Sequence, residues 1–372
     1  MATAVAEDVR TTGKKKKTVD VGQIPQWRLM VRRFMQSKLS VAGGIVLIIM
    51  YLMAVFADFL APYHYDAIDT DHAWAAPTSI SFAGGWPSVC GVTQTLDQAT
   101  FTWVYTQDCN TTYPIKLFVQ GYPYRLLGII PTTTHLFGVD EPAKLYLWGA
   151  DKQGRDLFAR TMIGSRVSLT IGLVGVGIAL LLGAFLGTIS GYFGGTIDNL
   201  MQRVIELIQT FPTLPLWLAL AAALPSDLPV VQRFFFISIV LSLVSWTGLA
   251  RQVRGKVLGY RNADYTSAAL AAGGSHMRII STHMVPNSLS HIIVVAALAV
   301  PAAILGETAL SFLGVGMLPP AVSWGVLLKD AQQVQVVTTY PWLMIPGVAV
   351  VVAVLCYNFL GDGLRDAVDP YG

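Results

Sequence analysis

Long runs of apolar, uncharged residues restrict the possible folds of this chain more than any other feature of its sequence. A helix needs about 20 such residues to cross the hydrocarbon layer of a bilayer. Six segments meet or approach this length, near residues 41–60, 167–190, 204–224, 234–251, 289–310 and 342–360. Hydrophobic residues make up 53% of the chain and charged residues only 13%, which is unlike a soluble domain. The sequence therefore predicts an all-α integral membrane protein with six transmembrane helices.

A seventh uncharged window, residues 308–328, is interpreted differently. It contains Pro319-Pro320 and several glycines, which cannot sustain a regular lipid-facing helix. We expect a helix end followed by a re-entrant or surface segment. The alternative is a kinked seventh span, which would move the C-terminus to the other side of the membrane.

The distribution of lysine and arginine predicts the orientation of the helices, because short cytoplasmic flanks carry most of these residues. The N-terminal tail contains Lys14–Lys17, so we expect it in the cytoplasm, with the residues before 25 as a disordered polar extension. Counting four spans onward from a cytoplasmic N-terminus places the region after residue 251 in the cytoplasm. This region is also rich in basic residues, so the span count and the charge distribution agree. Arg155, Arg160 and Arg166 depart from the rule, because this orientation leaves them outside. With six spans, both termini are cytoplasmic.

The segment between the first two spans, residues 62–160, is too long and too rich in aromatic residues to be a simple linker. We interpret it as a large extracytoplasmic loop domain. Cys90 and Cys109 both lie in it, whereas Cys356 lies in the last span. Since the outer compartment is oxidising, the sequence favours a disulfide between Cys90 and Cys109. The alternative is a pair of free, buried thiols.

The stretch DYTSAALAAGGSHMRIISTHMVPN, residues 264–287, lies between the fourth and fifth predicted spans. Ala268 and Ala269 favour a helix, Gly273 can supply the positive φ that ends it, and Ser275 is a good N-cap for another. Pro286 is expected to stop the segment before the next span. This pattern predicts a helix–turn–helix hairpin on the cytoplasmic face, narrow enough to fit the groove of a partner.

The same stretch resembles the "EAA" loop of ATP-binding-cassette (ABC) importer permeases, with Ala268, Ala269, Gly273 and Pro286 at characteristic positions. Four further blocks, in the right order, resemble the dipeptide, oligopeptide and nickel permeases, in their second-subunit branch of oligopeptide permease C type. These blocks are residues 148–169, 191–206, 306–328 and 358–370. The resemblance covers the chain from about residue 145 to its end, together with the first span.

The first block is similar to the family pattern L-G-T-D-x-x-G-R-D. Its matching positions are Asp151, Gly154, Arg155 and Asp156, which the predicted topology places on the extracytoplasmic side. The chain departs from the family pattern in the EAA loop, where Ser267 occupies the usual glutamate position and Val285 replaces a leucine. The resemblance therefore does not imply an anionic contact at residue 267.

The resemblance implies that a short coupling helix docks onto an ATPase subunit. The residues assigned to this contact are Ser267, Ala268, Ala269, Gly273, Ser275, Arg278 and Pro286. The family also implies the chain's partners: a homologous second permease, two ATPase subunits that bind ATP and magnesium, and an extracytoplasmic substrate-binding protein. The expected location is the bacterial cytoplasmic membrane.

These inferences divide the chain into five regions. They are a cytoplasmic N-terminal tail (1–38), a first transmembrane helix (39–61), the extracytoplasmic loop domain (62–160), an ABC permease core (161–361) with a cytoplasmic coupling loop (252–287), and a cytoplasmic C-terminal tail (362–372).

Several chemical patterns are missing from the sequence. It has no G-x-x-x-x-G-K-[ST] phosphate-binding loop and no histidine or cysteine cluster with metal-ligand spacing. Arg203 and Glu206 suit a local ion pair near an interface, and Glu307 lies near the end of the fifth span, so no ionisable residue is placed at the centre of a span. We therefore expect a non-catalytic transport subunit without a cofactor or metal of its own.

The function that these patterns predict is ATP-driven import by alternating access, with oligopeptides or related small solutes as cargo. An alternative within the same family is an oligosaccharide or nickel complex as cargo. An alternative from another class is an ATP-independent secondary carrier, and dependence of uptake on a separate ATPase would distinguish it.

Overall fold

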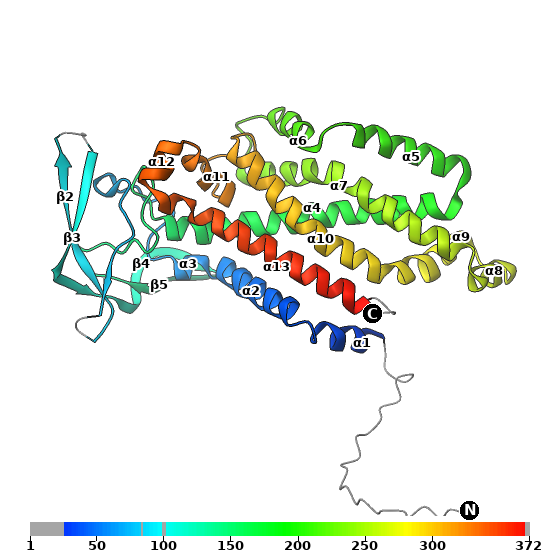
Figure 1. Cartoon of the computed structure of the whole chain (residues 1–372), viewed down its shortest axis with the longest axis horizontal. Coiled ribbons are helices and arrows are strands. Elements are labelled where there is room, and N and C mark those ends of the chain that lie inside the picture. Colours follow the sequence, from blue (N-terminus) through cyan, green and yellow to red (C-terminus); the bar gives the residue numbers. More distant parts are fainter. Residues whose placement is uncertain (1–25, 83–84, 99–101, 369–372) are drawn as a thin grey trace, which may run out of the picture.

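A bundle of long helices forms most of the molecule, with strands at one end and a short helical hairpin at the other (Figure 1). The computed structural model describes residues 26–82, 85–98 and 102–368. The predicted N-terminal extension with Lys14–Lys17 lies outside the described residues. Within them, α1 (Gln26–Phe34) precedes the first long helix and lies at the same end of the bundle as the hairpin.

Five helical segments are long and apolar enough to cross a membrane. They contain α2 (Lys38–Val55), α4 (Leu157–Phe193), α7 (Val230–Arg261), α10 (Val285–Phe312) and α13 (Ile345–Val368). A sixth span is possible if α5 (Gly195–Thr210) and α6 (Thr213–Ala222) cross together. The mostly helical membrane architecture predicted from the sequence is confirmed.

The third predicted span, residues 204–224, is not one continuous helix. Its residues belong to α5 and α6, which are bent by 82° at the break between them. Pro212 lies in this break with an extended backbone. Proline has no N–H to donate and disfavours helical geometry in the residue before it, so Phe211 and Pro212 end α5.

The seventh apolar window contains the predicted helix end. α10 ends at Phe312, and Gly314 follows with a φ of +82°. The short helix α11 (Trp324–Leu328) comes next, and all five of its residues are buried. A 3-10 turn (Lys329–Ala331), α12 (Val334–Thr339) and a second 3-10 turn (Pro341–Met344) then lead to α13. Among the described residues, no candidate span covers this window.

The prediction of an all-α chain is wrong for the segment between α3 (Ala57–Leu60) and α4. This segment forms a three-stranded antiparallel sheet from β1 (Ile80–Ser81), β2 (Ser88–Asp97) and β3 (Thr102–Pro114), and a two-stranded one from β4 (Lys116–Leu126) and β5 (Ile130–Gly138). Threonine, tyrosine and valine are frequent in these strands and fit a pleated surface well. A 3-10 turn (Thr70–His72) precedes them.

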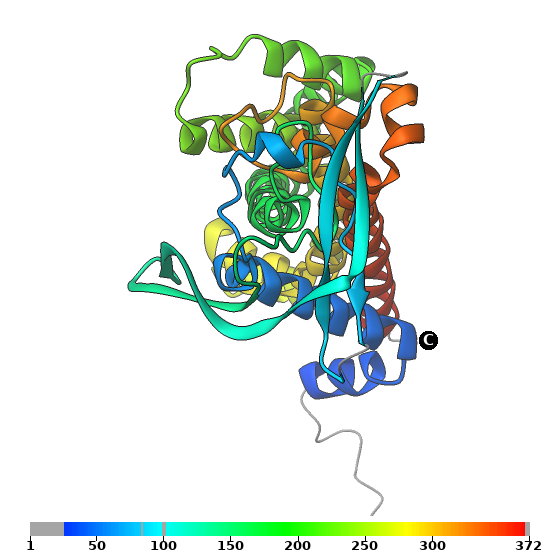
Figure 2. The same cartoon turned by 90° about the vertical axis from the view of Figure 1, so that its left-hand side faces the viewer.

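The first sheet contains the disulfide expected from the sequence. In its register Val89 pairs with Tyr113 and Cys90 pairs with Thr112, and a bulge follows at Gly91. Cys90 and Cys109 are bonded, with Cα atoms 4.4 Å apart. Figure 2, viewed from the strand end, shows the β2–β3 and β4–β5 strand pairs lying across the end of the bundle.

Helix α4 lies near the centre of the bundle and contacts α2, α7, α10 and α11 (Figure 2). Gly183, Gly187 and Gly191 form a stripe along the face that meets α7. A Cβ atom added at Gly187 would lie 2.4 Å from the carbonyl oxygen of Ala250. The two backbones can therefore approach closely only because this stripe carries no side chains.

The predicted region boundaries do not all coincide with helix ends, as two examples show. α4 begins at Leu157, within the predicted loop domain, because Asp156 caps it there. α13 continues to Val368, so most of the predicted C-terminal tail is helical, and residues 369–372 lie outside the described residues.

Candidate functional site

The predicted hairpin is present at the end of the bundle opposite to the strands (Figure 1). Its first helix, α8 (Asp264–Ala271), contains Ser267, Ala268 and Ala269. Gly273 follows with a φ of +81°, and its N–H donates to the carbonyl of Leu270 at 2.9 Å. The Ser275 hydroxyl then accepts from the Arg278 N–H at 3.3 Å and caps α9 (His276–Ile279). The turn and the cap predicted from the sequence are both confirmed.

The base of the hairpin is attached to the helix bundle. The Tyr192 hydroxyl at the end of α4 lies 2.8 Å from Nδ1 of His276. The buried Thr266 hydroxyl donates to the carbonyl of Tyr260, near the end of α7, at 2.8 Å. Ile279 is buried among side chains of α7 and α10. The hairpin is thus tied to three of the candidate spans.

The tip of the hairpin is exposed. Ser267, Ala268, Gly273, Ser275 and Arg278 all have exposed side chains or backbone. The apolar side chain of Met277 is 70% exposed, and those of Tyr265 and Leu270 are exposed as well. Small residues beside exposed apolar ones form a surface that another protein can cover.

Pro286 does not stop the hairpin, in contrast to the prediction. It lies in the first turn of α10, where a missing N–H is tolerated. A π-helical turn (Ile280–Met284) joins α9 to α10 just before it. His276–Phe312 therefore forms one helical segment, which connects the hairpin to this candidate span without a break.

At the strand end, Asp151 organises the tight turn that precedes α4. Its side chain is buried and accepts from the backbone N–H groups of Gln153 at 2.8 Å and Arg155 at 3.1 Å. The Arg155 guanidinium donates to the same carboxylate at 2.8 Å. Gly154 has a φ of +72°, and a Cβ atom there would lie 1.7 Å from the carbonyl oxygen of Asp69. These residues hold the turn against the segment before the strands.

Asp156 is the N-cap of α4. Its carboxylate oxygens accept from the N–H groups of Phe158 and Ala159, both at 3.1 Å. Burial raises the pKa of the Asp156 carboxyl to about 7, while the two hydrogen bonds to the helix oppose the shift. The structure therefore brings together Asp151, Gly154, Arg155 and Asp156. Each of them makes a contact within this chain that explains why its residue type is needed there.

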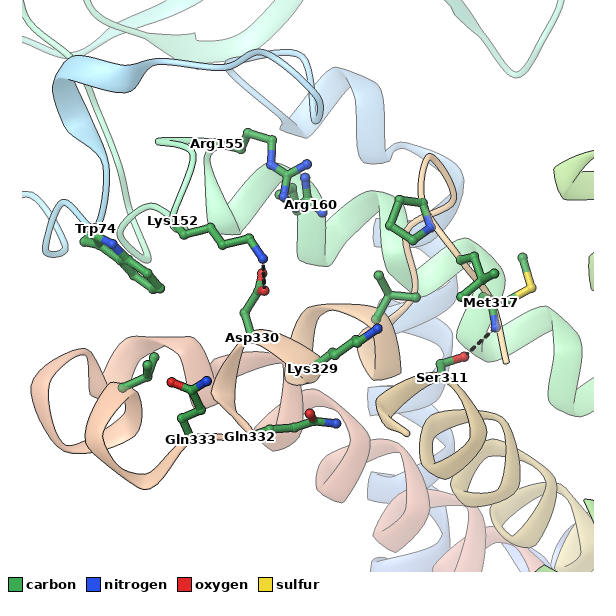
Figure 3. Close-up of a pocket in the computed structure, with 14 residues that line it drawn as sticks. Trp74, Lys152, Arg155, Arg160, Ser311, Met317, Lys329, Asp330, Gln332 and Gln333 are labelled. Atoms are coloured by element: carbon green, nitrogen blue, oxygen red, sulfur yellow. Dashed lines mark hydrogen bonds and ion pairs between the residues drawn. The ribbon is translucent and has the colours of Figure 1, made fainter. Parts of the chain in front are cut away.

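A pocket of about 390 Å³ lies beside this turn, between it and the α11–α12 segment (Figure 3). Positively charged residues from both sides line it, namely Lys152, Arg155, Arg160 and Lys329. Asp330 is the acidic residue of its lining and lies 2.8 Å from Lys152. Sequence reasoning missed this pocket, because its two sides are far apart along the chain.

Sequence reasoning also missed the environment of Glu307. This residue is completely buried, and its carboxylate accepts from the hydroxyl groups of Ser311 at 2.7 Å and Ser168 at 3.1 Å. The Ser168 hydroxyl in turn accepts from the backbone N–H of Trp324 at 3.1 Å. The network joins α4, α10 and α11. The isolated glutamate in an apolar segment was the only signal of it in the sequence.

Comparisons with known proteins agree with this architecture. Residues 179–371 match the family model of the binding-protein-dependent transport system inner membrane component, and residues 25–77 match that of the N-terminal TM domain of oligopeptide transport permease C. The chain is 34% identical to the oligopeptide transport system permease protein OppC of Haemophilus influenzae, over 92% of this chain and 88% of that protein.

Two Bacillus subtilis proteins are also similar. The oligopeptide transport system permease protein OppC is 30% identical over 99% of this chain and 95% of its own length. The dipeptide transport system permease protein DppC is 32% identical over 91% of this chain and 84% of its own length.

The family consists of transport components of the inner membrane that work with separate ATPase and substrate-binding proteins, so the chain is not an enzyme. Its apolar helices fit a multi-pass protein of that membrane. The chain therefore belongs to the family of binding-protein-dependent transport system inner membrane components, as an ABC importer permease of the oligopeptide permease C type.

Proposed function

We propose that this chain is the second permease subunit of an ABC importer for short peptides, and that the hairpin around residues 264–284 couples it to the ATPase. Peptides are the cargo named for the similar permeases of Haemophilus influenzae and Bacillus subtilis. The chain itself binds no nucleotide in this proposal: ATP and magnesium are held by two partner ATPase subunits. A homologous permease completes the transport pathway, and an extracytoplasmic binding protein delivers the peptide.

The observation that carries the coupling role is the combination of an exposed tip with a firmly attached base. Met277 is exposed, yet the same short helix contacts Tyr192 of α4 through His276 and continues into α10. When ATP binding closes the ATPase dimer, the groove that holds the tip moves. Because the base is tied to three spans, this movement rocks them between outward and inward openings.

The positions of α1 and of the end of α13 support the proposed orientation. The start of α1 and the end of α13 lie at the hairpin end of the bundle, opposite to the strands (Figure 1). The disulfide belongs to the strand end and fits an oxidising outer compartment. Arg155 and Arg166, which break the positive-inside rule, form ion pairs with Asp151 and Asp58, so their charges are compensated locally. We therefore place both termini in the cytoplasm and residues 62–156 outside.

The coupling role is tested by Met277→Glu in the complete complex, reconstituted in proteoliposomes with its ATPase and binding protein. A charge on this exposed side chain leaves the permease fold intact but prevents burial of the tip in an apolar groove. We expect ATP-dependent peptide uptake to fall by at least about tenfold, with loss of co-purifying ATPase.

Gln36→Glu is the matched control, because it adds the same charge at an exposed residue of the same bundle end, outside the hairpin. Its uptake should equal that of the wild type. Normal uptake by a correctly inserted Met277→Glu variant would refute the coupling role.

A further inference from the structure

The pocket between the turn before α4 and the α11–α12 segment has a small excess of positive charge, which comes from Lys329. Of the other cationic side chains that line it, Lys152 pairs with Asp330, Arg155 with Asp151 and Asp66, and Arg160 with Asp151. The Lys329 ammonium group forms no ion pair or hydrogen bond in the part of the chain that the structure describes, and it lies 2.8 Å from the position that a Cβ atom at Gly314 would take. Such a pocket attracts an anionic ligand.

The two arginines form the inner edge of the pocket. Both lie beside the buried Asp151, whose Oδ2 is 2.8 Å from Nε of Arg155 and 3.6 Å from Nε of Arg160. Arg160 is only 4% exposed, and its Nε has no hydrogen-bond partner among the described residues. This Nε is buried beside Asp151, so the ion pair with Asp151 holds the guanidinium at the edge of the pocket.

The opposite wall is apolar. Met317, Leu318, Val326 and Val336 line it, and Trp74 closes one side. Trp74 has a φ of +63°, which a bulky residue rarely adopts, and its ring stacks on Tyr340 with centroids 4.6 Å apart. Strained conformations of this kind persist where the surroundings enforce them and often mark binding sites.

The Lys152–Asp330 ion pair crosses the rim of the pocket, from the turn before α4 to the 3-10 turn after α11. Lys152 is half exposed, so a second carboxylate can reach its ammonium group. A ligand that offers one carboxylate would thus meet Lys152 and Lys329 at the rim and the arginines further in. A guanidinium can also hold both oxygens of such a group.

We propose that this pocket binds the free C-terminal carboxylate of a peptide as it passes into the permease, with the adjacent side chain of the peptide against the apolar wall. The proposal rests on the proposed function, in which the cargo is a peptide and the strand end faces outward. A terminal carboxylate is common to all unmodified peptides, so this contact would position cargo without selecting its sequence. The depth of the arginines favours the slim end of a chain over a broad protein surface.

The test compares two probes in the reconstituted complex with its binding protein and ATPase. One probe is a short alanine- and phenylalanine-containing peptide with a free carboxylate, and the other is the same peptide with a C-terminal amide. The variant is Lys329→Gln, which removes one positive charge from the rim without breaking an ion pair or side-chain hydrogen bond among the described residues. Uptake rates at low peptide concentration are measured for both probes and both proteins.

We expect Lys329→Gln to lower uptake of the free acid by about tenfold and that of the amide by less than about twofold. Lys152→Gln should show the same selectivity for the acid. Lys116→Gln is the matched control, because this lysine is also exposed and paired with an aspartate at the strand end but lies outside the pocket. It should leave both rates unchanged. The comparison between variant and wild type cancels any preference of the binding protein for the acid.

Two results would overturn the carboxylate site. Equal losses for acid and amide would mean that Lys329 acts on another step, such as docking of an acidic surface of the binding protein. Unchanged uptake of both probes would mean that the pocket takes no part. If the wild-type complex takes up neither probe with ATP, the proposed function itself fails, which distinguishes the two failures.

Discussion

The hairpin and the turn before α4 both lie in stretches that resemble family sequence patterns, but the chain uses them in opposite ways. In the hairpin, Gly273 faces open space and Met277 is exposed. In the turn, Gly154 fits against the backbone of Asp69, and the side chain of Asp151 is surrounded by donors of its own chain. The first region leaves its surface for a partner, whereas the second satisfies its own groups.

This difference predicts two classes of variant. Changes at the hairpin tip should reduce transport while the permease stays folded, because few contacts of the chain depend on the tip. Changes in the turn should reduce stability, because α4 begins there and lies at the centre of the bundle. The predictions below compare matched residues of the two regions.

The largest difference is expected between Gly154→Ala and Gly273→Ala. Both glycines have a positive φ, but the new methyl group clashes with a carbonyl at residue 154 and meets no atom within 4 Å at residue 273. Gly154→Ala should cost at least about 4 kcal/mol of stability, and Gly273→Ala about 1 kcal/mol. Thermal unfolding of the detergent-solubilised proteins measures both. Similar melting temperatures for the two variants would contradict the comparison.

A smaller and local effect is expected when both Cys90 and Cys109 are replaced by serine. The bridge joins residues 19 positions apart, so its loss should destabilise the first sheet by about 3 kcal/mol. Limited proteolysis should then cut within β2 or β3, while cleavage of the hairpin stays as in the wild type. An intact-mass shift of the wild type on reduction and alkylation verifies the bridge. An unchanged cleavage pattern would show that the disulfide does not support the sheet.

The smallest difference in stability is expected between variants of the two helix caps. Asp156→Ala removes two hydrogen bonds from a buried carboxylate and should cost about 2 kcal/mol, whereas Ser275→Ala removes one exposed cap and should cost about 0.5 kcal/mol. Chemical denaturation of the two variants in the same detergent measures this ratio. If Ser275→Ala proved the more damaging, the hairpin would carry more of the fold than its exposure suggests.

Several features could be predicted because they depend on neighbouring residues. The apolar runs predicted the long helices, and the pattern around Gly273 and Ser275 predicted the turn and the cap of the hairpin. The predictions were less accurate at prolines, whose effect depends on position: Pro212 separates α5 from α6, whereas Pro286 is accommodated in the first turn of α10. The strands were missed because the chain was predicted as all-α, although the many threonines and tyrosines of the loop domain favour strands.

The sequence by itself determined the membrane helices, the hairpin and the membership of the chain in its family, since each of these follows from local patterns. Only the tertiary structure decided which charged and polar side chains meet. Glu307 meets Ser168, 139 positions away, and Lys152 meets Asp330, 178 positions away. The physical reason is that helix length and turn chemistry are properties of short segments, whereas a buried network or a pocket requires the packing of segments that are distant in sequence.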